Sequence, residues 1–211
     1  MELLHLTSVV FNWYVLLPSI AFGVLLFFLS YRLMRKERYS LLIACGVTNS
    51  FYHGVNTGKE CGEYYDIDKA LSNEETAVNI TAWYVDNINE ISRKTKIDAL
   101  AFIEREDGPV GALPLMKLIS SQTKIPSFIV RPRKRIHSSA IKGINKIHGK
   151  NIAIISDVAT SGFSIENVAN LLTNFKSNVV AAITVVNRGG ENVKDHFKNK
   201  NILFRYVDDL C

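Results

Sequence analysis

The sequence predicts an α/β domain with a mainly parallel sheet flanked by helices, preceded by one transmembrane helix. From about residue 98 to the C-terminus, apolar runs of strand length alternate with amphipathic runs of helix length. The strand-length runs are apolar at nearly every position, which is typical of parallel strands covered by helices on both faces. The N-terminal part differs, because residues 9–31 contain no charged side chain. A helix of that length crosses the hydrocarbon layer of a bilayer.

The N-terminal segment, residues 1–38, is interpreted as a membrane anchor with a basic cytoplasmic flank, and residues 39–211 as the folded domain. Four Lys or Arg residues stand in residues 32–38, whereas Glu2 is the one acidic or basic charge before the apolar run. This asymmetry predicts a single-pass protein of the cell membrane whose C-terminal domain lies in the cytoplasm. The alternative is a buried helix of the core.

The elements of the domain follow from hydrophobic periodicity. A long helix is expected to begin near Ser72, where Ser72 and Glu75 have the spacing of a capping box, and its apolar side chains recur every three to four residues through Tyr84 to Ile91. Strands are then expected at residues 98–103, 126–130, 151–156, 179–186 and 202–207, with helices at residues 111–120 and 164–175.

Ligands of parallel sheets bind at the carboxyl ends of the strands. The loops after Ile103, Val130, Ser156 and Val186 are therefore where we expect a site.

The charge and the cysteine content of the chain limit the kinds of ligand that this site would bind. The net charge is +5, and basic residues cluster at residues 32–38 and 131–135, which suits a membrane surface and phosphate-rich ligands and does not favour nucleic acid. The three cysteines lack CxxC spacing, so neither a disulfide framework nor a zinc site is indicated.

The stretch SDVATSGFS, residues 156–164, joins a predicted strand to a predicted helix. Asp157 is expected directly after the strand, and Thr160, Ser161 and Gly162 precede the helix. Hydroxyls and backbone N–H groups at a helix start form an anion pocket, and a glycine lets the backbone approach a phosphate. An acid beside such a pocket suits sugar hydroxyls or a metal ion, so the stretch favours a phosphorylated sugar. The alternative is a plain turn with Ser164 as the helix N-cap.

These residues resemble the phosphoribosyl-pyrophosphate (PRPP) loop of type I phosphoribosyltransferases, whose fold is Rossmann-like. Three further segments resemble orotate phosphoribosyltransferases in the same order along the chain, namely residues 57–75, the mobile catalytic loop at 130–138, and the base-contacting segment at 185–191. The resemblance covers about residue 39 to the C-terminus.

The resemblance implies a transferase that joins a base, with orotate favoured, to PRPP and releases pyrophosphate in pyrimidine nucleotide synthesis. Asp157, Arg135 and His137 would be catalytic, and Arg188 would bind the base. PRPP would be held by Lys59, Arg131, Asp157, Thr160, Ser161, Gly162 and Ser164. The implied cofactor is Mg²⁺, bound through PRPP and either Asp157 or Asp107, and the implied assembly is a homodimer whose mobile loop reaches the neighbouring subunit.

The sequence departs from the family pattern at several positions. Ser156 stands where the first of two acids is usual, Pro132 replaces a loop lysine, and Asn187 replaces an acid before Arg188. Residues 102–111 replace a glycine-rich pyrophosphate turn and add three acidic side chains, Glu104, Glu106 and Asp107. These departures support a second hypothesis, a PRPP or nucleotide sensor or scaffold at the membrane with weakened catalysis. A purine-type phosphoribosyltransferase is a third reading, less favoured because Arg188 suits a carboxylate.

Overall fold

The computed structural model describes residues 22–27, 29–30, 47–48, 52–53, 60–61, 64–65, 67–104, 113–131, 140–144 and 146–209. The chain divides into two compact units, Met1–Ser40 and Leu41–Cys211. In the first unit, residues 22–27 and 29–30 are helical, and apolar side chains such as Phe22 and Phe27 are exposed. None of the helices among the described residues combines the length and the apolarity that a membrane crossing requires. Most of the expected span at residues 9–31 lies outside the described residues.

The second unit contains a seven-stranded sheet in the order β10-β9-β8-β5-β6-β7, with β11 pairing with β9. The strands are β5 (Ala99–Ile103), β6 (Ser127–Val130), β7 (Ile141–Lys142), β8 (Asn151–Ala159), β9 (Asn178–Asn187), β10 (Leu203–Arg205) and β11 (Asp208–Asp209). All pairings are parallel except that of β6 with β7. Two short antiparallel ladders pair β1 (Val47–Thr48) with β4 (Tyr64–Tyr65) and β2 (Tyr52–His53) with β3 (Glu60–Cys61).

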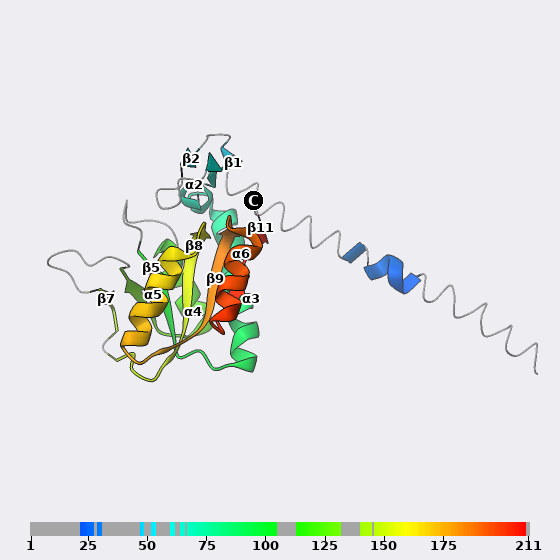
Figure 1. Cartoon of the computed structure of the whole chain (residues 1–211). Coiled ribbons are helices and arrows are strands. Elements are labelled where there is room, and N and C mark those ends of the chain that lie inside the picture. The colour runs from blue at the N-terminus through cyan, green and yellow to red at the C-terminus, as the bar shows by residue number, and fades with distance from the viewer. Residues whose placement is uncertain are drawn as a thin grey trace, which may run out of the picture. The chain divides into compact units, whose positions relative to one another are not determined.

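Helices cover both faces of the sheet, as the sequence predicts (Figure 1). One face packs against α2 (Ile67–Leu71), α3 (Glu74–Lys94) and α4 (Leu113–Thr123), and the other against α5 (Phe163–Asn174) and α6 (Gly190–Asn199). Every residue of β5 is buried, which explains why its sequence shows no alternation. All the buried core residues that the structure describes lie between Ile67 and Val207. The described core therefore lies within the Leu41–Cys211 unit, as expected of a domain with its own hydrophobic core.

Two expected element boundaries are corrected, and one helix is added. Helix α3 begins at Glu74 and not near Ser72, because Asn73 is the N-cap and its Oδ1 accepts a hydrogen bond from the Thr76 N–H at 3.0 Å. Strand β8 continues past Ser156 to Ala159, because the parallel ladder with β9 extends to the pair Ala159 and Asn187. Asp157 is thus within the strand. Helix α6 was not expected, since its sequence is mostly polar and buries only Val193 and Phe197.

The topology places the switch point of the sheet between β5 and β8. From β5 the chain moves outward to β6 on one side, then returns and continues from β8 to β9 and β10 on the other side. Strand order therefore reverses between these two neighbours, and in open parallel sheets ligands bind at the carboxyl ends of the strands at this point. Helices α4 and α5, which follow β5 and β8, cover opposite faces of the sheet.

Candidate active site

The loop from Thr160 to Gly162 joins β8 to the first residue of α5. Gly162 has φ of +75°, a left-handed conformation that residues with a Cβ rarely adopt. A Cβ at this position would also lie 3.1 Å from the ring of Phe197 on α6. Both observations require glycine here, so the tight approach of this loop to α6 is fixed by the sequence.

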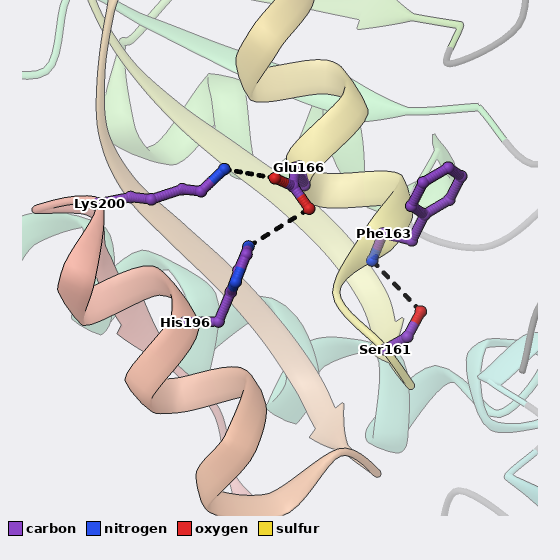
Figure 2. Close-up of polar contacts among 5 residues, drawn as sticks. All are labelled: Ser161, Phe163, Glu166, His196 and Lys200. Atoms are coloured by element: carbon purple, nitrogen blue, oxygen red, sulfur yellow. Dashed lines mark hydrogen bonds and ion pairs between the residues drawn. The ribbon is translucent and has the colours of Figure 1, made fainter.

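The N-terminus of α5 has no side-chain cap. Gly162 occupies the N-cap position, and Ser164, the N-cap of the plain-turn alternative, lies inside the helix. The Ser161 hydroxyl accepts from the Phe163 N–H at a long 3.4 Å (Figure 2). The N–H groups of the first helical turn need acceptors from outside the helix. An anion at this position would supply them and would be favoured by the helix dipole.

The first turn of α5 is tied to α6 through Glu166. Its carboxylate accepts from Lys200 and lies 3.3 Å from His196 Nε2, so one acid on α5 meets two basic side chains at α6 (Figure 2). The hydrogen bond from Lys200 is the main cause that holds the pKa of Glu166 below its usual value. The ion pair with Lys200 links the start of α5, and with it the anion loop, to the end of α6.

Asp157 is held by contacts on all sides of its backbone. Asp157 is only 8% exposed, and its Oδ1 accepts a hydrogen bond from the Val158 N–H at 2.8 Å. The Asp157 carbonyl accepts from the Thr184 hydroxyl on β9 at 2.8 Å. One residue earlier, the fully buried Tyr84 of α3 donates its hydroxyl to the Ser156 carbonyl at 2.5 Å. The carboxylate is therefore positioned by two neighbouring elements.

Ser156 supplies no carboxylate in place of the first acid of the family pattern. Its hydroxyl is buried and makes long contacts, 3.5 Å to Asp157 Oδ1 and 3.4 Å to the Val158 carbonyl. Both partners belong to the same strand. Among the described residues, Asp157 is thus the one carboxylate at the end of β8.

Arg188 follows β9 and lies beside the end of β8. Its N–H donates to the Ala159 carbonyl at 2.7 Å. The residue is 8% exposed, and Nη2 is buried without a hydrogen-bond partner among the described residues. A buried guanidinium donor without an acceptor is costly, so such a group implies a ligand that carries an acceptor. A carboxylate matches the donor fork of arginine.

Gly189 and Asn187 shape the turn that presents Arg188. A Cβ on Gly189 would lie 2.3 Å from the Thr160 carbonyl oxygen and 2.1 Å from Val193, so the anion loop and this turn pack directly against each other. The buried Asn187 amide donates to the Gly190 carbonyl at 3.0 Å and accepts from the Gly189 N–H at 3.1 Å. A carboxylate at position 187 could not donate the first of these bonds. The departure from the family's acid therefore has a local structural role.

Arg131 is already paired with an acid. Its Nε and Nη2 both donate to the Glu104 carboxylate, with Nη2 at 2.9 Å. Glu104 follows β5 and Arg131 follows β6, and the last residues of these strands are register partners. Glu104 is one of the three acidic side chains that distinguish this chain from the family's glycine-rich turn. The Glu104 carboxylate faces the Arg131 guanidinium and, in this arrangement, neutralises its charge.

The structure brings together five of the expected site positions on adjacent elements. Asp157, Thr160, Ser161, Gly162 and Ser164 lie at the end of β8 and the start of α5, with Arg188 alongside. Lys59, Arg135, His137, Pro132, Glu106 and Asp107 lie outside the described residues, so their roles stay predictions. Among the residues that are described, no group of three or more His, Cys, Asp or Glu side chains could hold a metal ion by itself.

Three residues of the site were not anticipated as such. Tyr84 was interpreted only as an apolar position of α3, although a buried tyrosine hydroxyl normally has a partner, and that preference was the signal in the sequence. Gly189 offered the signal of a double glycine directly after a strand. The pairing of Glu104 with Arg131 could not be found from the sequence, because it depends on the register of β5 and β6.

Comparison with known proteins identifies the family and the fold. Residues 79–207, more than half of the chain, match the family described as the phosphoribosyl transferase domain. An orotate phosphoribosyltransferase of Pyrococcus abyssi is 29% identical over 171 residues, which are 78% of this chain and 90% of the relative. The crystal structure of orotate phosphoribosyltransferase from Aeropyrum pernix superposes with a TM-score of 0.63 at 20% identity, over 82% of this chain and 94% of that one. Orotate phosphoribosyltransferase of Mycobacterium tuberculosis H37Rv in complex with PRPP superposes with a TM-score of 0.58 at 19% identity, over 82% and 96% of the two chains.

Proposed function

The chain belongs to the phosphoribosyl transferase domain family, and we propose that it joins orotate to PRPP with release of pyrophosphate, a step of pyrimidine nucleotide synthesis. The observation that carries the choice of base is Arg188. Its buried Nη2 has no hydrogen-bond partner among the described residues, and orotate carries a carboxylate that could accept from it, whereas adenine and other purine bases carry none. Purine bases offer ring nitrogens and carbonyl oxygens as acceptors, but no carboxylate to match the donor fork of arginine.

The anion loop supports the placement of PRPP. The uncapped N-terminus of α5 and the hydroxyls of Thr160, Ser161 and Ser164 suit the 5′-phosphate, while the Asp157 carboxylate suits the ribose 2′- and 3′-hydroxyls. The distance between these two features is set by the short, glycine-constrained turn from Asp157 to Gly162. One sugar phosphate can therefore use both.

The reaction exchanges one bond at the ribose C1 for another. The C1–O bond to pyrophosphate breaks as a C1–N bond to the base forms, and positive charge develops on the sugar ring while negative charge leaves with pyrophosphate. Cations of the 131–137 segment, Arg131, Arg135 and His137, would stabilise the leaving anion. The Asp157 carboxylate would face the developing positive charge on the ribose. Closure of the loop would exclude water and so favour transfer over hydrolysis.

Mg²⁺ fits the donors that are present. In phosphate-binding sites this ion is usually bound by one or two carboxylates together with substrate phosphate oxygens and water. Asp157 is a carboxylate in such a position, and Asp107 of the acidic turn is a second candidate. When bound with PRPP, the ion would neutralise charge on pyrophosphate.

A second candidate function is a membrane-associated sensor or scaffold that binds PRPP or a nucleotide and turns over slowly. The pairing of Arg131 with Glu104 favours it, because the paired guanidinium is not available to pyrophosphate until the ion pair opens. The buried Ser156 hydroxyl in place of an acid points the same way. Both functions would use the same residues at the end of β8 and the start of α5, and they differ in whether bound PRPP is turned over.

We further propose that residues 9–31 anchor the protein in the cell membrane with the domain in the cytoplasm, and that the domain acts as a homodimer. The uncharged apolar run and the four basic residues at 32–38 support the anchor and its orientation. The relation of the 131–138 segment to a loop that reaches the neighbouring subunit in the family supports the dimer. Light scattering of the Leu41–Cys211 unit would test the dimer, and alkaline extraction of membranes would test the anchor.

An activity assay with a set of different bases tests the proposed function. The Leu41–Cys211 unit is incubated with PRPP, Mg²⁺ and one base at a time, and pyrophosphate release is measured. Release with orotate and not with adenine, hypoxanthine or uracil is expected, and Asp157→Asn should lower the rate by at least about 100-fold without unfolding the domain. Stabilisation by PRPP in a thermal shift without release for any base would favour the sensor. If PRPP neither stabilises the domain nor leads to pyrophosphate release, both functions are excluded.

A further inference from the structure

A groove of about 500 Å³ lies at the open edge of the sheet, away from the anion loop. It is formed by the segment that contains β7 and leads into β8, together with the C-terminal end of α5 (Figure 1). Its apolar lining includes Ile141, Ile144, Ile147 and Phe175, and its basic lining is Lys146, His148 and Lys176. Lys146 and Lys176 precede the parallel strands β8 and β9, whereas the site loops follow these strands. The two lysines therefore lie at the amino ends of the strands, and the active site lies at their carboxyl ends.

The chain around this groove is basic and contains no acid. Residues 140–150 include three lysines and one histidine, residues 173–178 include Lys176, and neither segment has an Asp or Glu. Lys142, Lys146 and Lys176 are exposed, and the described residues form no ion pair between any of them and an acidic side chain. The unneutralised charge calls for an anionic partner.

Helix α5 ends in a way that exposes both charge and apolar surface. Lys176 has φ of +56°, and the bonds from the Lys176 N–H to the Thr173 carbonyl and from the Ser177 N–H to the Leu172 carbonyl form a Schellman motif. Glycine is the usual residue at that position, and the negative end of the helix dipole favours a lysine nearby. The dipole does not explain why the preceding residue, the apolar Phe175, is 49% exposed.

We propose that this surface, defined by Lys146, His148, Phe175 and Lys176 with the groove between them, docks the domain onto a bilayer that contains anionic phospholipids. The lysines would contact the headgroups, and Phe175 would enter the interfacial layer, where a ring next to basic side chains is stable. The site at the carboxyl ends of the strands stays open to its substrates. This contact is separate from the apolar N-terminal segment, because all its residues belong to the Leu41–Cys211 unit.

A bilayer fits better than a nucleic acid. Binding of single strands without sequence preference uses several aromatic side chains on which successive bases stack. Phe175 is the one Phe, Tyr or Trp side chain in the lining of the groove. An apolar groove floor also contributes nothing to a contact with phosphates, whereas it suits lipid.

The test uses the Leu41–Cys211 unit, so the N-terminal segment cannot contribute. Co-sedimentation is compared for vesicles of phosphatidylcholine alone and of equal parts phosphatidylcholine and phosphatidylserine. We expect binding to the anionic vesicles only, weakened by salt. Lys146→Gln with Lys176→Gln should lower the partition coefficient by about 25-fold, since a lysine near an anionic surface contributes about fivefold. Phe175→Ser should weaken binding at unchanged charge.

Matched controls make the result decisive. Lys117→Gln with Lys194→Gln removes the same net charge from α4 and α6 and should leave binding almost unchanged. Circular dichroism checks that each variant is folded. Equal binding to both vesicle types, an equal loss in the control pair, or the absence of binding would overturn the proposal. So would tighter binding to a mixed-sequence single-stranded RNA that Phe175→Ser leaves unchanged.

Discussion

Glu104 and Arg131 form a two-point ion pair across the ends of the neighbouring parallel strands β5 and β6. Both side chains are largely shielded, with exposures of 22% and 16%. The Arg131 N–H also donates to the Ala140 carbonyl at 2.9 Å, so the first and last described residues around the 132–139 loop are joined. The loop that is expected to close over pyrophosphate thus starts from a cation whose charge is already neutralised.

Glu104→Gln should strengthen PRPP binding. The carboxylate competes with pyrophosphate for one guanidinium, and an amide competes less because it carries no charge. We expect the KM for PRPP to fall about threefold to tenfold, in line with the typical net strength of one hydrogen bond, while Arg131→Ala should raise it. Steady-state kinetics at fixed orotate measures both. If Glu104→Gln raised the KM as Arg131→Ala does, Glu104 would be a residue that positions Arg131 for the substrate.

Arg188→Met separates a role in base binding from a role in folding. Nη2 has no partner among the described residues, so replacement by an apolar side chain of similar length should leave the melting temperature equal or higher. Loss of a charged hydrogen bond to the base should raise the KM for orotate by about 10-fold to 150-fold, with the KM for PRPP nearly unchanged. A large drop in melting temperature with a normal KM for orotate would show that Arg188 is structural.

The fold could be predicted from the sequence because the parallel strands are apolar on both faces and the helices are periodic. β5 illustrates this, since five buried residues in a row admit few readings. Helix α6 escaped prediction because two apolar residues, Val193 and Phe197, suffice to dock it on α5 and β10. The polar remainder of α6 gives almost no periodic signal.

The site could be predicted only where its residues are close in sequence. Asp157 to Ser164 form one strand-to-helix junction, so their proximity follows from local structure. The pairing of Glu104 with Arg131 and the bond from Tyr84 to Ser156 join residues that are 27 and 72 positions apart. Such contacts depend on strand register and helix placement, which periodicity does not specify.

Tyr84→Phe should reduce stability and catalysis together. The change removes one hydroxyl and leaves the buried Ser156 carbonyl without that donor, at a cost of about 1–3 kcal/mol. For a domain of this size, each 1 kcal/mol lowers the melting temperature by about 2–4 °C. Because Asp157 is the next residue, kcat should fall more than the KM for orotate changes. Tyr84→Phe with an unchanged kcat would mean that Thr184 alone positions Asp157.

Gly189→Ala should be among the most destabilising single changes in the site. The added Cβ would lie 2.1 Å from Val193 Cγ2 and 2.3 Å from the Thr160 oxygen, so the anion loop must move. We expect a loss of at least about 3 kcal/mol in the free energy of unfolding. Gly149→Ala is the matched control, because Gly149 has φ of +73° but a Cβ there would meet no atom within 4 Å, and backbone strain alone costs about 1–2 kcal/mol. Denaturant titrations of both variants test the order, and an equal loss would mean that the loop yields without cost.

Glu166→Gln should make stability less dependent on acid pH. The pKa of Glu166 is lowered below its usual value of 4.5, mainly by the hydrogen bond from Lys200. A carboxyl whose folded pKa is depressed contributes stability that is complete above the unfolded value and is lost as pH falls through the folded value. At neutral pH the variant should therefore be less stable by about 0.5 kcal/mol, as expected for a largely accessible ion pair, and the difference should vanish as pH falls well below 4.5. Glu191→Gln, in the first turn of α6 and paired with Lys194 at a more exposed position, should show a smaller difference. If the loss of unfolding free energy in Glu166→Gln persisted unchanged in acid, the side chain would act through packing. The charge interaction between α5 and α6 would then not be what holds the anion loop in place.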